Sequence, residues 1–147
     1  MKVVIQRCKH GSVSVDNKLI NEIDNGYVIL VGVHVTDTID DLNYLVRKVL
    51  NLRIFDDENG VMNKNIIDAG GKILAISQFT LQAVTREGNR PSWNEAMKGE
   101  DAVKLYDLFC EELNKSVPTF KGVFGAEMLV KIDNDGPVTI IIDSKNK

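Results

Sequence analysis

The sequence predicts an α+β fold, and three observations support this. A continuous apolar run at residues 27–33 is typical of a strand buried on both faces, and residues 72–81 predict a second buried strand. Two other segments, residues 39–50 and 100–113, repeat apolar side chains at helical spacing. Strand patterns precede, separate and follow these helices. With 44% hydrophobic and 27% charged residues, the 147-residue chain is expected to form one soluble domain over residues 1–147.

The first third of the chain predicts the strands that begin the sheet. Residues 3–5 are apolar, and residues 12–15 alternate polar with apolar side chains. Asp16 and Asn17 can turn the chain, so that residues 18–23 return as the second strand of a hairpin.

Helical periodicity begins after the buried strand at residues 27–33. Asp37, Asp40 and Asp41 are expected in the first turn of this helix, where the helix dipole favours acidic side chains. The following residues, 53–55, predict a short strand that ends at a polar turn.

The second buried strand, at residues 72–81, carries the first candidate site. Alternation would place Leu74, Ile76, Gln78 and Thr80 on one face, which begins apolar and becomes polar. Hydrogen-bonding side chains on such a strand need partners or line a wet pocket, although Thr is also a common strand residue. On this strand alone, a pocket and a frayed strand end fit equally well.

The last part of the chain predicts a polar loop at residues 82–93, the second helix, and two closing strands at residues 126–133 and 138–143. A Gly-Pro pair separates these two strands and is typical of a turn. Glycine followed by proline also leaves fixed backbone carbonyls open to a ligand.

Charge and composition exclude several classes of function. A net charge of −3 argues against binding through a broad positive field, but it permits one local contact. The longest apolar stretch, residues 27–35, is too short to cross a membrane, and no secretory signal pattern is expected. Cys8 and Cys110 lack metal-ligand spacing, so we expect no metal site, no cofactor and a reducing, cytoplasmic location.

No widespread catalytic motif accounts for a function. The sequence lacks a G-x-S-x-G elbow and an H-E-x-x-H zinc motif, and its Gly-Gly-Lys run lacks the rest of a phosphate-binding loop. His10 and His34 stand alone, and a single histidine is more often structural than catalytic. An enzyme with this sequence is therefore not expected to use a histidine-dependent triad.

Two segments taken together resemble the paired signatures of one enzyme family. Ser77-Gln78-Phe79-Thr80 and Asn134-x-Gly136-Pro137-x-Thr139 are similar, in order and spacing, to the two motifs of the D-aminoacyl-tRNA deacylases. Shorter likenesses cover nearly the whole chain, at Val4-Ile5-Gln6-Arg7, Leu52-Arg53-Ile54-Phe55, residues 60–63, Arg90-Pro91-Ser92 and Phe124-Gly125-Ala126.

The resemblance implies a homodimer with a compact, β-barrel-like α+β fold of antiparallel or mixed sheets and two main helices. It implies hydrolysis of the ester between a D-amino acid, or glycine, and the terminal ribose of a tRNA, which is a chiral proofreading step. The expected partner is the tRNA acceptor end, with no membrane and no DNA.

The resemblance also assigns roles to the first motif. Ser77, Gln78, Phe79 and Thr80 become the catalytic set, in which the Phe79 N–H holds the developing oxyanion. Gln78 and Thr80 would orient the ester and the water, while a ribose hydroxyl of the substrate assists proton transfer. Thr80 as a covalent nucleophile is the competing mechanism, and the sequence offers it no obvious base.

In the second motif, Gly136-Pro137 is expected to be cis and to reach into the pocket of the partner subunit. Its carbonyls would admit D-amino acids and glycine but clash with an L side chain. Arg7 is expected to support this segment, because a guanidinium can hold several carbonyls at once. A surface arginine on the strand is the nearly equal alternative. The remaining expected substrate-binding residues are Asn134, Thr139 and Met128.

Arg86, Arg90 and Lys98 follow the first motif and are candidates for RNA contacts, with a solvated loop as the equally weighted alternative. Two other functions stay open at this point: an esterase for small D-amino-acid derivatives, and a non-catalytic RNA-binding or scaffold protein.

Overall fold

A computed structural model describes all residues, 1–147. In chain order the elements are β1 (Lys2–Val15), β2 (Lys18–Ile23), β3 (Gly26–Gly32), α1 (Ile39–Asn51), β4 (Phe55–Asp56), β5 (Met62–Lys64), β6 (Lys72–Ser77), the 3-10 helix η1 (Phe79–Gln82), α2 (Gly99–Asn114), β7 (Thr119–Lys121) and β8 (Leu129–Asp143).

The central strand of the main sheet is β1, which pairs along both of its edges. One edge runs antiparallel to β8 over residues 2–14. The other edge runs antiparallel to β3 over residues 2–8 and to β2 over residues 11–15. Strand β6 then runs parallel to β3, and β7 runs parallel to β6. The sheet is therefore mixed, and the predicted α+β class is confirmed.

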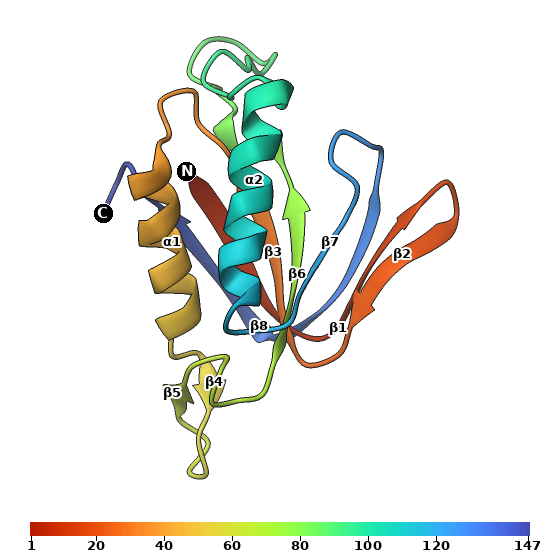
Figure 1. Ribbon diagram of the computed structural model, residues 1–147, viewed down its shortest axis with the longest axis vertical. Helices are drawn as coiled ribbons and strands as arrows, with labels where there is room; N and C mark the ends of the chain where they lie inside the picture. The colour runs from red at the N-terminus through yellow and green to blue at the C-terminus, as the bar shows by residue number, and fades with distance from the viewer.

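Both helices lie side by side against one face of this sheet (Figure 1). Alternate residues of β3 and β6 divide between two apolar clusters: Ile29 and Ala75 pack with the helices, whereas Val28 and Leu74 pack on the opposite face. The predicted burial of these strands on both faces is thus confirmed. Neither helix combines the length and the apolar character that crossing a membrane would require.

Local backbone chemistry fixes the turns that join the first three strands. Asp16 and Asn17 both have positive φ, +50° and +62°, which is the geometry of a tight hairpin turn, so the predicted hairpin is confirmed. At Gly26, a Cβ atom would lie 1.8 Å from the carbonyl oxygen of Lys72. Only glycine therefore lets the start of β6 approach the start of β3.

The second predicted buried strand is too long. Strand β6 ends at Ser77 because its partner β3 ends at Gly32, and Gln78 leaves the strand with φ −145° and ψ 81°. The next turn is the 3-10 helix η1, whose Gln82 side chain donates to the Gly32 carbonyl at 2.9 Å. The strand alternation that placed Gln78 and Thr80 on one face is therefore wrong.

The two predicted closing strands are one strand, β8. Its register with β1 pairs Gln6 with Thr139 but Cys8 with Asn134, so β8 has more residues than β1 between these pairs. The additional residues of β8 bulge out of the hydrogen-bond ladder, and the Gly-Pro pair lies in this bulge instead of in a free turn.

The short strand predicted at residues 53–55 is displaced, since β4 begins only at its last residue. The turn after it is held by the Asp57 carboxylate, which accepts the N–H groups of Asn59 at 2.9 Å and Val61 at 3.1 Å. The chain then returns as β5, a strand that the sequence did not predict.

Helix α1 begins beside a buried ionic cluster. Asp40 and Asp41 occupy its first turn as predicted, but Asp37 precedes the helix and pairs with the buried α-ammonium group of Met1. The Lys145 ammonium lies 2.9 Å from Asp41 Oδ2. These contacts tie both ends of the chain to the start of α1.

Asp41→Asn is expected to lower the free energy of unfolding at pH 7 by about 2 kcal/mol, because charge-assisted hydrogen bonds are lost. Burial favours a higher pKa for Asp41, but hydrogen bonds from Ser144, the Thr38 N–H and Lys145 outweigh it and hold the pKa well below its ordinary value. Such a carboxylate stabilises the fold above the unfolded pKa of about 3.9, and this contribution is lost as the pH falls toward the folded pKa. Urea unfolding should show a smaller difference at pH 3 than at pH 7; an equal difference would contradict the assignment.

Candidate active site

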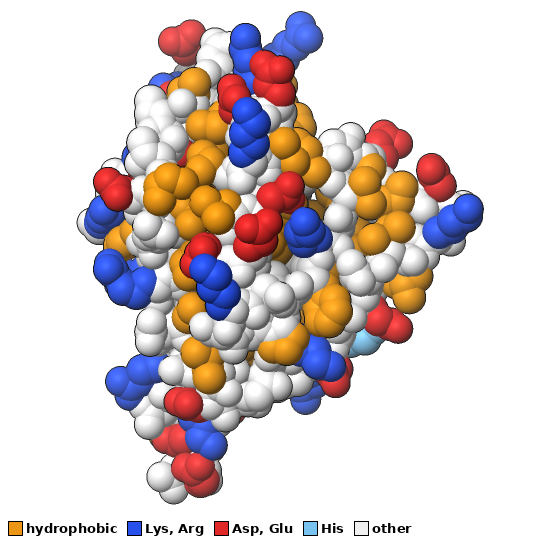
Figure 2. Space-filling view, viewed as in Figure 1, with side chains coloured by type: hydrophobic (Ala, Val, Ile, Leu, Met, Phe, Trp, Pro, Cys, Tyr) orange, Lys and Arg blue, Asp and Glu red, His pale blue; other side chains and the backbone are white.

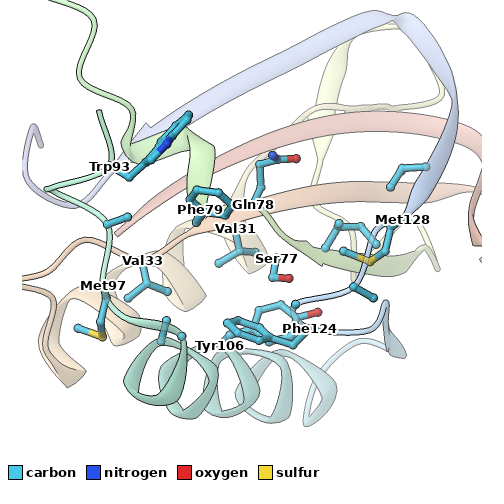
Figure 3. Close-up of a pocket in the computed structure, with 17 residues that line it drawn as sticks. Val31, Val33, Ser77, Gln78, Phe79, Trp93, Met97, Tyr106, Phe124 and Met128 are labelled. Atoms are coloured by element: carbon cyan, nitrogen blue, oxygen red, sulfur yellow. The ribbon is translucent and has the colours of Figure 1, made fainter. Parts of the chain in front are cut away.

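A pocket of about 560 Å³ opens at the carboxyl ends of β3 and β6, next to α2 (Figure 3). Hydrophobic residues make up 13 of the 17 that line it, and none of the 17 carries a charge. The lining residues are Val31, Val33, Ile76, Ser77, Gln78, Phe79, Trp93, Ala96, Met97, Gly99, Ala102, Tyr106, Phe124, Gly125, Ala126, Met128 and Val130.

The first motif supplies the polar part of this pocket. Ser77, Gln78 and Phe79 line it where β6 gives way to η1. The backbone N–H of Gln78 donates to the Val31 carbonyl at 2.7 Å, which anchors the turn to β3. The Gln78 side-chain amide donates to Thr80 Oγ1. Thr80 itself does not line the pocket and contacts it through Gln78.

The pocket holds no side chain able to act as a base at neutral pH. Burial raises the pKa of Tyr106 above its ordinary value, and its hydroxyl donates to the Ala75 carbonyl at 2.7 Å. Neither histidine lines the pocket. Burial also raises the pKa of Cys8 to about 11 and that of Cys110 to about 12, so these thiols stay protonated. The pocket offers backbone N–H groups, a hydroxyl and an amide.

The second motif lies at the other end of the sheet. Arg7 stands opposite Tyr27 at the start of β3, whereas Ser77 stands beside Val31 near its end. The two positions are roughly 13 Å apart along the strand. Arg7 and the Asn134–Thr139 residues do not line the pocket of their own chain. The structure therefore brings the first motif to Met128 but leaves the second motif apart.

Arg7 connects the second motif to the segment around β4. Its side chain is only 9% exposed, and its Nη1 donates to the Ile54 carbonyl at 2.6 Å. Its Nε donates to the Asp135 carbonyl at 3.3 Å and lies 3.3 Å from the Asp135 carboxylate. Nη1 also lies 3.6 Å from the carboxylate of Asp56.

The Gly136-Pro137 peptide bond is cis, as the sequence analysis expected, and both residues are exposed. Gly136 has φ +121°, and a Cβ there would lie 2.7 Å from Val138 Cγ2 and 3.2 Å from Arg7 Nη2. This position therefore admits glycine only.

Asn134 closes the base of the bulge. Its side-chain amide donates to the carbonyls of Arg7 at 3.0 Å and Val138 at 3.1 Å. Thr139 Oγ1 donates in turn to Asn134 Oδ1 at 3.3 Å. The polar side chains of Asn134 and Thr139 are thus used to shape the backbone of the second motif.

The three candidate RNA contacts differ in their surroundings. Arg86 lies 3.4 Å from the Glu95 carboxylate, whereas Arg90 and Lys98 are exposed and form no ion pair. Basic and acidic side chains are interspersed over the face shown in Figure 2, without a broad positive area.

Most of the apolar wall of the pocket was not predicted from the sequence. Tyr106 lies within the predicted second helix and is buried, but it also borders the pocket. Phe124 was noted only as part of a resemblance. Trp93 and Met97 carried no signal, because they come from an irregular loop whose path depends on the folded chain.

A profile of the family described as D-Tyr-tRNA(Tyr) deacylase matches residues 4–143. The chain belongs to this family. The chain is 51% identical to the D-aminoacyl-tRNA deacylase of Parabacteroides distasonis and 55% identical to that of Clostridium novyi. Each alignment covers 100% of this chain and 99% of the relative.

Two solved structures share the deacylase-family fold. A protein named c-Myc DNA Unwinding Element Binding Protein is 43% identical with a TM-score of 0.93, over 97% of this chain and 98% of its own. A probable eukaryotic D-amino acid tRNA deacylase is 17% identical with a TM-score of 0.82, over 96% of this chain and 97% of its own. The expected compact, barrel-like fold with two helices is thereby confirmed.

Arg7→Lys is expected to lower the free energy of unfolding by about 2 kcal/mol, because an ammonium cannot hold the Ile54 and Asp135 carbonyls together with two carboxylates. Arg53→Lys is the matched control, since Arg53 is exposed and donates to Asn63 at the surface. Urea unfolding of both variants checks this. Equal, small effects would show that the buried guanidinium contributes no more than an exposed one.

Proposed function

We propose that the chain hydrolyses the ester bond of D-aminoacyl-tRNA, and of glycyl-tRNA, to free tRNA and amino acid, as a chiral proofreading step in the cytoplasm. Family membership supports the reaction class. The observation that carries the proposal is the turn of Ser77, Gln78 and Phe79 at the edge of an apolar, uncharged pocket. Such a pocket suits a substrate whose ester is already activated.

The chemistry uses the backbone of η1 and the substrate itself. Water attacks the ester carbonyl, and the Phe79 N–H donates a hydrogen bond to the carbonyl oxygen as negative charge forms on it. This group begins a 3-10 helix, where the first N–H groups have no acceptor within the helix. Gln78 and Thr80 orient the ester and the water. The ribose oxygen then leaves and takes a proton from the neighbouring ribose hydroxyl, which regains one from the attacking water.

The apolar wall suits the terminal adenosine that carries the ester. Tyr106 and Phe124 lie together on one side of the pocket, with ring centroids 5.7 Å apart, and Met97 and Met128 extend the apolar surface (Figure 3). Aromatic and thioether groups bind the face of a nucleobase without needing charge. The polar edge at Ser77 then meets the ester.

The protein acts as a homodimer in this proposal. The exposed Gly136-Pro137 segment cannot complete the pocket of its own chain, and the outer edge of β8 has no partner strand. A second copy would bring its segment over the pocket and place backbone carbonyls beside the α-carbon of the substrate. In a D-amino acid and in glycine, a hydrogen atom on the α-carbon faces these carbonyls and fits. In an L-amino acid the side chain faces them and clashes.

Contacts to the tRNA are few in this proposal. Arg90 and Lys98 are exposed and unpaired, so they are better placed than Arg86 to bind phosphates of the acceptor end. With a net charge of −3 and no broad basic face, the salt dependence of binding should be shallow.

Purified protein is expected to deacylate D-tyrosyl-tRNA rapidly and to leave L-tyrosyl-tRNA intact, and Gln78→Ala should slow the first reaction about a hundred-fold through lost positioning. Release of labelled tyrosine measures both. D-Tyrosine methyl ester is assayed alongside: equally fast turnover would favour a small-molecule esterase. If the protein hydrolyses none of these esters, the result would favour an RNA-binding or scaffold protein.

Mixing Gln78→Ala chains with Gly136→Ala chains is expected to restore about a quarter of wild-type activity, because random pairing makes half the dimers mixed and each mixed dimer has one intact site. Each variant alone should show no more than about a hundredth of wild-type activity while remaining folded and dimeric by circular dichroism and light scattering. No recovery on mixing would mean that each pocket uses the segment of its own chain.

Thr80→Ala is expected to retain activity on D-tyrosyl-tRNA at about a tenth of the wild-type rate, because only one orienting hydrogen bond is lost. Thr80 lines no part of the pocket, and the only side-chain partner of its hydroxyl is the Gln78 amide. Complete loss in a folded variant, or an acyl-Thr80 adduct trapped for mass spectrometry, would favour the covalent mechanism.

A further inference from the structure

Two large aromatic side chains are exposed together at the mouth of the pocket. Phe79 is 56% exposed and Trp93 is 41% exposed, although both line the pocket. Their ring centroids lie 5.2 Å apart, with the planes at 72°. In Figure 3 they lie on the side of the pocket opposite Tyr106 and Phe124. An edge-to-face pair leaves ring faces open for another flat group.

Backbone hydrogen bonds fix the two segments that carry these rings before any ligand binds. Phe79 follows the Gln78 N–H that is anchored to β3. Ser92, the residue before Trp93, bridges to Val84 through two backbone hydrogen bonds of 3.0 Å. The Trp93 carbonyl accepts the Ala96 N–H at 3.0 Å. A preformed aromatic surface loses little conformational entropy on binding.

We propose that Trp93 and Phe79 form a stacking platform for the base of the nucleotide that precedes the terminal adenosine. This rests on the proposed function: when the aminoacyl-adenosine fills the pocket, the RNA chain must leave through the mouth where the two rings lie. Nucleobases stack on exposed aromatic rings regardless of sequence. The loop that carries Trp93 also carries the unpaired cations Arg90 and Lys98, which suits an anionic strand better than an apolar protein surface.

Kinetics on two truncated substrates test the platform. D-Tyrosyl-adenosine lacks the preceding nucleotide, and the D-tyrosyl ester of the trinucleotide CpCpA contains it. Wild-type protein should show a kcat/KM about ten-fold higher on the trinucleotide ester. Trp93→Ala should bring this ratio close to one, and Trp93→Phe should keep most of it. Val61→Ala, which removes an exposed apolar side chain from the β4–β5 hairpin, should leave the ratio as in wild type.

Fluorescence gives a readout that needs no turnover, because Trp93 is the only tryptophan of the chain. Titration with the dinucleotide CpA, without an amino acid, should quench its emission more strongly than adenosine does. Equal quenching by the two ligands would place Trp93 on the terminal nucleoside and overturn the platform. This test is decisive even if the wild-type protein hydrolyses neither ester, so it separates the platform from the proposed function.

A second copy of the chain is the alternative occupant of these rings. Light scattering of Trp93→Ala distinguishes it from RNA: an unchanged oligomeric state with a reduced substrate ratio supports the platform. A dissociated oligomer with an unchanged ratio assigns the rings to contact between copies and overturns the proposal.

Discussion

The two hydrogen-bond ladders of β1 determine where the functional parts of this protein lie. One ladder holds β3, and through it β6, so the pocket forms where these two strands end. The other ladder holds β8, and it places the Gly136-Pro137 bulge near Arg7, at the opposite end of the sheet. The helices cover one face of the sheet but do not connect the two places. The distance between the motifs is therefore set by strand pairing, before any side chain of the site is considered.

The chemistry of the pocket follows from what its walls lack. No charged side chain lines it, and the thiols and the tyrosine hydroxyl nearby are kept protonated by burial. In the proposed mechanism, acyl transfer relies on backbone dipoles fixed by the fold and on groups that arrive with the substrate. An activated aminoacyl ester suits that mechanism, which needs no histidine in the pocket.

Features that depend on local sequence were predictable, and those set by distant contacts were not. The Asp16-Asn17 turn and helix α1 follow from residues close together in the chain. The end of β6 does not, because it depends on where β3 ends. The continuity of β8 depends on a bulge that the pairing with β1 absorbs. Trp93 and Tyr106 line the same pocket only once the chain is folded, so no pattern in the sequence indicated it.

The number of residues in the β8 bulge determines where the Gly136-Pro137 backbone lies. Arg7 and Asn134 fix its two flanks, and its surplus residues set how far the Gly136-Pro137 backbone stands out from the sheet. One residue more or less would move this backbone by about 3.3 Å and turn the following side chains to the other face. In the proposed dimer, discrimination between D- and L-amino acids would thus depend on the number of residues in the bulge. Side-chain substitutions in the pocket would leave the position of the Gly136-Pro137 backbone unchanged, whereas a single-codon insertion or deletion would shift it.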